Sequence, residues 1–153
     1  MAAPRVVSRS GNDAFGGFSW NGLVDMCAME PLHSFTPVQR VAHLSFWYMS
    51  EVNNGGHFQY FCNMEHFDHA EVVAALRSLG APRCAEILSN AIAQFEAADL
   101  DRPGSVEEYV ETEAEAAMED LDRRYYESGD AEFHAAMQGY LDANESEFIQ
   151  WVE

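Results

Sequence analysis

Two stretches of the chain carry side chains that could do chemistry. The first, SEVNNGGHFQYFCN over residues 50–63, places a histidine, a glutamine and an asparagine directly after an Asn-Gly breaker. The second, CNMEHFDH over residues 62–69, gathers thiol, imidazole and carboxylate groups, and thiols and imidazoles are good zinc ligands. A ligand or catalytic site would use His57, Gln59 and Asn63, whereas a metal site would use the second stretch.

The spacing of these groups matches no strong signature for such chemistry. A phosphate-binding loop needs a glycine run after a strand and a lysine, and this chain contains no lysine. A nucleophile elbow needs the G-x-S-x-G arrangement, which the sequence lacks. The second stretch has no paired cysteines, and Asp68 is better placed as a helix N-cap. We therefore predict no catalytic residue, no metal and no cofactor, and a ligand site at the first stretch remains an alternative.

The first stretch is interpreted primarily as a structural corner between two helical segments. Its defining residues are Asn53, Asn54, Gly55, Gly56, Gln59, Tyr60, Phe61 and Asn63. Asn and Gly tolerate positive φ, and we expect the two asparagines to bond backbone groups freed at the helix ends. Phe58 and Phe61 share a face that points into the core, and Gln59 and Asn63 share another face for polar contacts.

Capping signals divide most of the chain into helices. Thr36, Pro37 and Gln39 form a capping box with proline at the first helical position, which predicts a helix over about 37–52. Further helices are predicted over about 20–29, from Asp68 to Gly80, from Pro82, from the capping box at Ser105, and from Asp130 after the SGD break at 128–130. The last segment carries apolar residues as far as Trp151, with Asn144 as a candidate for dividing it, and strand signals are weak.

These elements predict an all-α fold. We expect one compact helical domain over residues 18–153, with about six to eight helices joined by short connections. Residues 1–17 are expected to form a flexible N-terminal tail. No apolar run is long enough for a transmembrane helix, and no secretory signal is recognised. The three widely spaced cysteines are expected to be reduced, which favours a cytoplasmic protein.

Charge is the strongest signal in the composition. The chain has 26 acidic residues against 8 basic ones, a net charge of −18, and residues 96–153 alone hold 18 acids and 3 arginines. This charge excludes direct nucleic-acid binding and binding to anionic membranes, because both need a basic surface. One acidic face is therefore expected to meet a basic partner, although a high net charge also serves solubility.

The acids are densest in the helix predicted after Ser105. They are Glu107, Glu108, Glu111, Glu113, Glu115, Glu119, Asp120 and Asp122. At about 1.5 Å rise per residue they give roughly one carboxylate per 3 Å, close to the phosphate spacing of about 3.4 Å along one DNA strand. Four of them, spaced i, i+4, form a ridge opposite the apolar stripe of the helix, and the self-repulsion of this ridge costs roughly 1 kcal/mol. The ridge consists of Glu107, Glu111, Glu115 and Glu119, and the stripe consists of Val106, Val110, Ala114, Ala117, Leu121 and Tyr125. Arg123 and Arg124 are expected to relieve the repulsion by pairing with Glu119 and Asp120.

The stretch EVNNGGHFQYFCN resembles the signature of a bacterial all-α family of unknown function that includes a DNA-mimic protein. The matching positions are Asn54, Gly55, Gly56, Gln59, Tyr60, Phe61 and Asn63. The stretches at 75–88 and 120–127 also resemble this family, so the resemblance runs from Phe35 to the C-terminus. His57 departs from the pattern, because the family usually carries an aromatic residue there. The resemblance implies an acidic homodimer that occupies the DNA site of a transcriptional regulator.

The sequence therefore predicts a non-enzymatic protein that binds a basic, DNA-binding protein by mimicking DNA phosphate charge. The residues expected to contact the partner are Glu107, Glu108, Glu111, Glu115, Glu119 and Asp122. One alternative is an immunity or antitoxin-type protein that blocks a basic toxin with the same acids. Another is a ligand-binding or enzymatic domain that uses the corner at 53–63.

Overall fold

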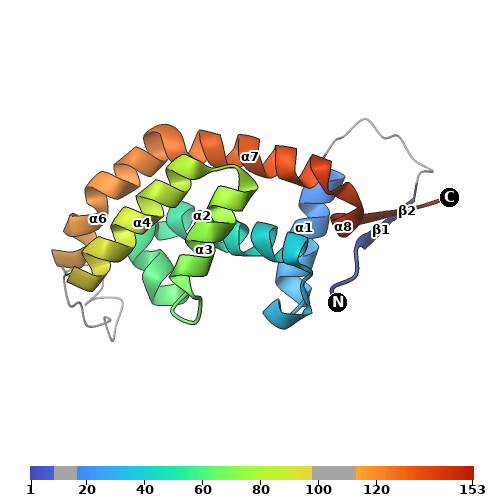
Figure 1. Cartoon of the computed structure of the whole chain (residues 1–153), viewed down its shortest axis with the longest axis horizontal. Helices are drawn as coiled ribbons and strands as arrows, with labels where there is room; N and C mark the ends of the chain where they lie inside the picture. The colour runs from blue at the N-terminus through green and yellow to red at the C-terminus, as the bar shows by residue number, and fades with distance from the viewer. Residues whose placement is uncertain (9–16, 98–112) are drawn as a thin grey trace.

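The helices begin and end where local capping chemistry directs them. The computed structural model describes residues 1–8, 17–97 and 113–153, with side chains from residue 118 onward in the last range (Figure 1). Its elements are β1 (Arg5–Ser8), α1 (Phe18–Met29), the 3₁₀ turn η1 (Leu32–Ser34), α2 (Pro37–Asn63), α3 (His69–Leu79), α4 (Pro82–Ala97), α6 (Glu113–Arg124), the π turn η2 (Tyr125–Gly129), α7 (Asp130–Ala143), α8 (Glu145–Phe148) and β2 (Ile149–Val152). The predicted all-α fold is confirmed.

Three of the predicted caps are confirmed. Thr36 accepts a hydrogen bond from the Gln39 amide, and the Gln39 side chain accepts one from the Thr36 amide, which completes the capping box of α2. Asp68 accepts bonds from the first amides of α3. Gly80 ends α3 in the left-handed region at φ 97°, where only glycine escapes the steric penalty.

The predicted break at SGD is wrong. Residues 113–143 form one continuous rod, drawn in orange to red in Figure 1, because a π turn joins α6 directly to α7. A π turn accommodates extra residues without ending the helix. The buried Cys84 thiol donates to the Gly129 carbonyl in this turn at 3.1 Å, and Asp130 continues the helix instead of capping it.

The expected N-terminal tail is ordered over its first residues. Residues 5–8 pair in parallel with residues 149–152, and Ala2 is buried with its amide bonded to the Ser34 carbonyl. Both termini therefore lie at one end of the molecule, beside α1 and α8 (Figure 1). The last segment is divided at Asn144, where α7 ends, and Trp151 lies in β2 with its ring in edge-to-face contact with Phe18. A four-residue strand is too short to show an alternating pattern, so its pairing depends on contacts distant in sequence.

Buried aromatic rings from several helices form the centre of the core. Tyr48 and Tyr60 of α2 meet edge to face at 5.4 Å, and Tyr48 meets Tyr125 of the π turn at 5.9 Å. Phe58 and Phe61 are buried as predicted, and Phe61 stacks on Phe95 of α4 at 4.4 Å. The second half of α2 is thus packed against both α4 and the rod.

His43 is buried on the other half of α2, where its imidazole lies 4.4 Å from the Phe35 ring. Its Nδ1 atom has no hydrogen-bond partner among the described residues. Burial, followed by the nearby charge of Arg40, lowers the pKa of His43 to about 4. The ring is therefore neutral in the fold at neutral pH.

We expect this histidine to make folding sensitive to acid. Its pKa is lower in the fold than the ordinary value of 6.5, so its contribution to stability is fully present above pH 6.5 and is lost as the pH falls toward 4. At about 1.4 kcal/mol per pKa unit, the loss is on the order of 3 kcal/mol. Urea unfolding of wild type and His43→Phe at several pH values measures this loss, because only the wild-type protein has a histidine at position 43 whose pKa differs between the folded and unfolded states. Equal pH slopes in both proteins would contradict the assignment.

Candidate functional site

The Asn-Gly-Gly corner is a sharp break inside α2. Gly55 is extended in φ (φ −165°, ψ 27°), whereas Gly56 has φ 77° and ψ −177°. The positive φ at Gly56 suits glycine, because a Cβ atom would clash with the backbone in this region. A Cβ atom built on Gly56 would also lie 2.3 Å from Oδ2 of Asp122, so the corner is in close contact with α6.

His57 connects the corner to α6 and to the core. Its side chain is 0% exposed, and Oδ1 of Asp122 accepts bonds both from its backbone N–H at 2.8 Å and from its Nδ1 at 2.5 Å. The other ring nitrogen, Nε2, lies 3.0 Å from the hydroxyl of the buried Tyr48. The residue that departs from the family pattern is therefore a fully bonded core residue.

The remaining polar side chains of the corner bond within the protein. Gln59 and Asn63 both donate to Oε2 of Glu51, at 3.0 and 2.7 Å, and so join the two halves of α2. Asn53 was expected to bond a backbone group, but its side chain donates to Asp130 at 3.2 Å. The Tyr60 hydroxyl lies 2.9 Å from Nδ1 of His69. These contacts give the amide side chains and the tyrosine of the motif a structural role.

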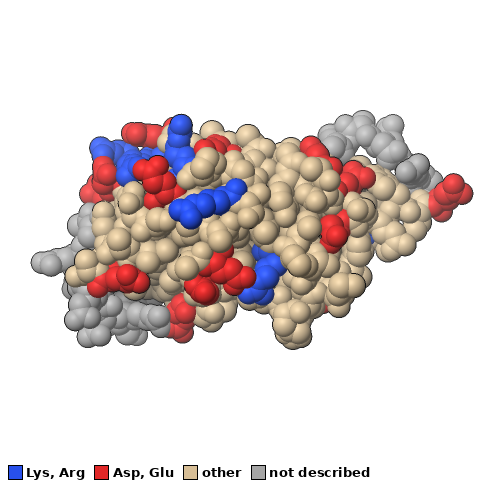
Figure 2. Space-filling view, in the orientation of Figure 1, with Lys and Arg blue, Asp and Glu red and all other residues tan. Residues whose placement is uncertain are grey.

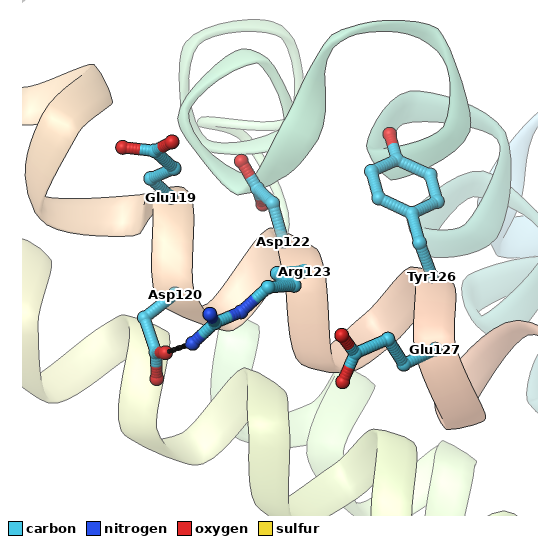
Figure 3. Close-up of a pocket in the computed structure, with 6 residues that line it drawn as sticks. All are labelled: Glu119, Asp120, Asp122, Arg123, Tyr126 and Glu127. Carbon is cyan, nitrogen blue, oxygen red and sulfur yellow. Dashed lines mark hydrogen bonds and ion pairs between the residues drawn. The ribbon is translucent and has the colours of Figure 1, made fainter.

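An acidic hollow lies beside the corner, at the C-terminal end of α6 (Figure 3). Its volume is about 770 Å³, and among the described residues its walls are Glu119, Asp120, Asp122, Arg123, Tyr126 and Glu127. In Figure 3, Asp122 and Tyr126 point toward the ribbon of α2, and Arg123 reaches back to Asp120. Among the described residues, neither Glu119 nor Glu127 forms an ion pair, so these two exposed carboxylates are the unpaired outward charges of the hollow.

Tyr126 places a rigid aromatic ring in this hollow. The residue is 52% exposed, yet its hydroxyl donates to the Val52 carbonyl at 2.7 Å. Burial and the neighbouring carboxylates of Asp122 and Asp130 raise its pKa, so the hydroxyl stays protonated. An exposed ring held beside carboxylates offers a face to a cationic side chain.

The structure distributes the predicted contact residues unevenly. Glu107, Glu108, Glu111 and the capping box at Ser105 lie outside the described residues, and Glu115 belongs to α6 without a described side chain. Glu119 is exposed, as a partner-binding acid requires. Asp122, by contrast, has a side chain only 21% exposed and bonds inward to His57.

The two arginines of α6 do not relieve the acidic ridge as expected. Arg123 pairs with Asp120 rather than with Glu119, and Arg124 pairs with Glu86 of α4 at 3.5 Å. Figure 2 shows the result, with arginines and acids gathered together over the end of the molecule that contains α6. Glu119 therefore keeps its charge available for other cations.

Sequence reasoning missed Tyr126 and Glu127 as members of this site. Both follow Glu119 at helical spacing, seven and eight residues later, so they lie on the same side of the rod. The sequence held one signal for this. Tyr125 belongs to the apolar stripe, so the next residue along the helix, Tyr126, points away from the core, and in the structure it is exposed.

Other site types find little support in the described residues. In residues 1–8, 17–97 and 113–153, no group of three or more His, Cys, Asp or Glu side chains is arranged to hold a metal ion. Burial raises the pKa of both Cys27 and Cys84 to about 12, which leaves these thiols protonated and unreactive. No helix in the described part of the chain is long and apolar enough to cross a bilayer.

One comparison with known proteins gives a match. The family described as "DMP19-like protein" matches residues 33–144, a range that includes the corner, α6 and the hollow. No match was found among curated proteins or among solved structures.

Proposed function

We propose, because the chain belongs to the DMP19-like protein family, that it is a non-enzymatic protein that binds a basic, DNA-binding protein. Its carboxylates would take the place of DNA phosphates on that partner. The observation that carries the proposal is the hollow at the end of α6, which the exposed Glu119 and Glu127 line together with the ring of Tyr126. The acids at 107–115 precede this hollow directly in the sequence.

The mechanism is competition for one set of cationic side chains. A DNA-binding surface holds phosphates with lysine and arginine, and those side chains cannot bind carboxylates and phosphates at the same time. A partner arginine fits the hollow well, because it can stack on the Tyr126 ring while it bonds Glu119 or Glu127. The attraction is electrostatic and the charged groups are exposed to solvent, so salt is expected to weaken the complex.

The same surface would also suit a basic toxin. An immunity or antitoxin-type role uses identical acids and differs only in the identity of the partner. The corner itself supports a ligand site less well, because His57, Gln59 and Asn63 already bond to other residues of the chain. Identification of the bound protein therefore separates the two interaction roles.

We expect neutralisation of the ridge to release the partner. Glu107, Glu111, Glu115 and Glu119 are changed together to Gln, and partners are captured from the native host with variant and wild type. At about 0.5 kcal/mol for each exposed contact, the loss is roughly 2 kcal/mol, or about thirty-fold in affinity.

A matched control removes the same charge at the other end of the molecule. Asp25 and Asp142 are changed to Asn, and Glu145 and Glu153 to Gln, which also removes four negative charges. This control is expected to retain the partner. If the ridge variant captures the same proteins at unchanged affinity, or if both variants lose them equally, the proposed contact is excluded.

A further inference from the structure

We propose that Asp122 is a positioning residue rather than a phosphate substitute, and that His57 is its partner in orienting the acidic end of α6. This inference rests on the proposed function, since it says which carboxylate of the hollow bonds to the core of the protein and not to the partner. It removes Asp122 from the set of partner-binding acids and leaves Glu119 and Glu127 as the outward charges.

Both oxygens of the Asp122 carboxylate face the corner. Oδ1 accepts two hydrogen bonds from one residue, the backbone N–H and the Nδ1 of His57, at 2.8 and 2.5 Å. Oδ2 lies so close to Gly56 that a Cβ atom added there would be only 2.3 Å from it. A carboxylate that is bonded on one oxygen and packed against backbone on the other has little capacity left for a partner.

The tautomer of the histidine ring follows from its neighbours. An ionised carboxylate can only accept hydrogen bonds, so Nδ1 of His57 carries the proton that faces Asp122. In the neutral ring Nε2 then accepts from the Tyr48 hydroxyl, 3.0 Å away. Burial raises the pKa of Tyr48 far above its ordinary value, which keeps this hydroxyl a donor. The chain of bonds therefore runs from the core to α6 with every ring nitrogen satisfied.

Two further contacts hold the same side of the rod against the same part of α2. The Tyr126 hydroxyl donates to the Val52 carbonyl at 2.7 Å, and Asp130 accepts from Asn53 at 3.2 Å. Asp122, Tyr126 and Asp130 are spaced four residues apart, so they form a row along the rod that faces residues 52–57. The row sets the rotation of the rod, and this rotation turns Glu119 and Glu127 outward.

The test compares two substitutions at Asp122 with two at Glu119. Asp122→Asn keeps an acceptor oxygen but removes the charge, whereas Asp122→Ala removes both. Glu119→Gln and Glu119→Ala form the matched pair for an outward charge. Two quantities are measured: hydrogen exchange of the backbone amides of His57 and residues 119–126, and the affinity for a labelled oligoarginine peptide at low salt.

We expect Asp122→Ala to accelerate exchange of these amides by about ten-fold or more, since it removes bonds to a charged acceptor. Asp122→Asn is expected to accelerate it by less than about three-fold and to retain the downfield Nδ1–H proton signal of His57. Both Glu119 variants should leave exchange unchanged and weaken oligoarginine binding equally, by about three-fold.

Three outcomes overturn the positioning role. They are unchanged exchange in Asp122→Ala, loss of the imidazole signal in Asp122→Asn, and a loss of oligoarginine affinity in Asp122→Asn as large as that in Glu119→Gln without any change in exchange. Failure of the proposed function looks different, since both Glu119 variants would then bind oligoarginine like wild type while the exchange results at Asp122 still hold. If Asp122→Ala does not fold, the imidazole signal and exchange in Asp122→Asn still decide the question.

Discussion

Replacement of Gly56 by alanine is expected to lower the free energy of unfolding by about 4 kcal/mol, through two separate costs. Gly56 has φ 77° and ψ −177°, a backbone conformation that essentially only glycine adopts, and forcing another residue into it costs about 1–3 kcal/mol. In addition, the new Cβ atom would lie 2.3 Å from Oδ2 and 2.9 Å from Cγ of Asp122. Asp122 must then move away from His57, which sacrifices hydrogen bonds to a charged group worth about 1.5–3 kcal/mol each.

Gly80 provides a control for the cost of a positive φ without a close contact. It has φ 97°, but the nearest atom to an added Cβ is the Cβ of Ala136 at 4.0 Å. Gly80→Ala is therefore expected to lose only about 1–2 kcal/mol. Chemical denaturation of both variants measures the difference between them, which reports the contact between the corner and α6. Equal losses in the two variants would show that the corner does not depend on this contact.

The second large effect is expected at Gly22, in the middle of α1. A Cβ atom there would lie 2.4 Å from the backbone oxygen of Phe148 and 3.2 Å from its carbonyl carbon. A backbone group cannot rotate aside as a side chain can, so α8 must shift, and with it the strand β2 that follows. We expect Gly22→Ala to destabilise the protein by about 3 kcal/mol through this overpacking.

Gly139 is the natural control, because it lies in α7 with no atom within 4 Å of an added Cβ. Gly139→Ala should stabilise the protein by about 0.5–1 kcal/mol, since alanine is the better helix former. Thermal unfolding ranks the two variants, and the indole N–H proton NMR signal of Trp151, which donates to Glu145, reports whether the end of the chain has moved. A Gly22→Ala protein as stable as wild type, with an unchanged Trp151 signal, would refute the close packing of α1 on α8.

The acidic site was only partly predictable from the sequence. The exposure of Glu119 followed from its place opposite the apolar stripe, because helical periodicity alone determines which residues share a face. The inward bond of Asp122 did not follow, since its partner His57 is 65 positions away. The ion pair of Arg124 with Glu86 likewise joins two helices whose packing no local pattern reveals.

By itself, the sequence determined the local architecture of this protein. The starts of α2 and α3, the left-handed end at Gly80 and the break at the two glycines all depend on atoms within about four residues, which local spacing encodes. The tertiary structure alone decided which side chains of these elements meet. It paired the first residues of the chain with the last, carried the helix through the π turn, and turned Asp122 toward His57. Each of these depends on long-range packing and backbone geometry, which composition and periodicity do not specify.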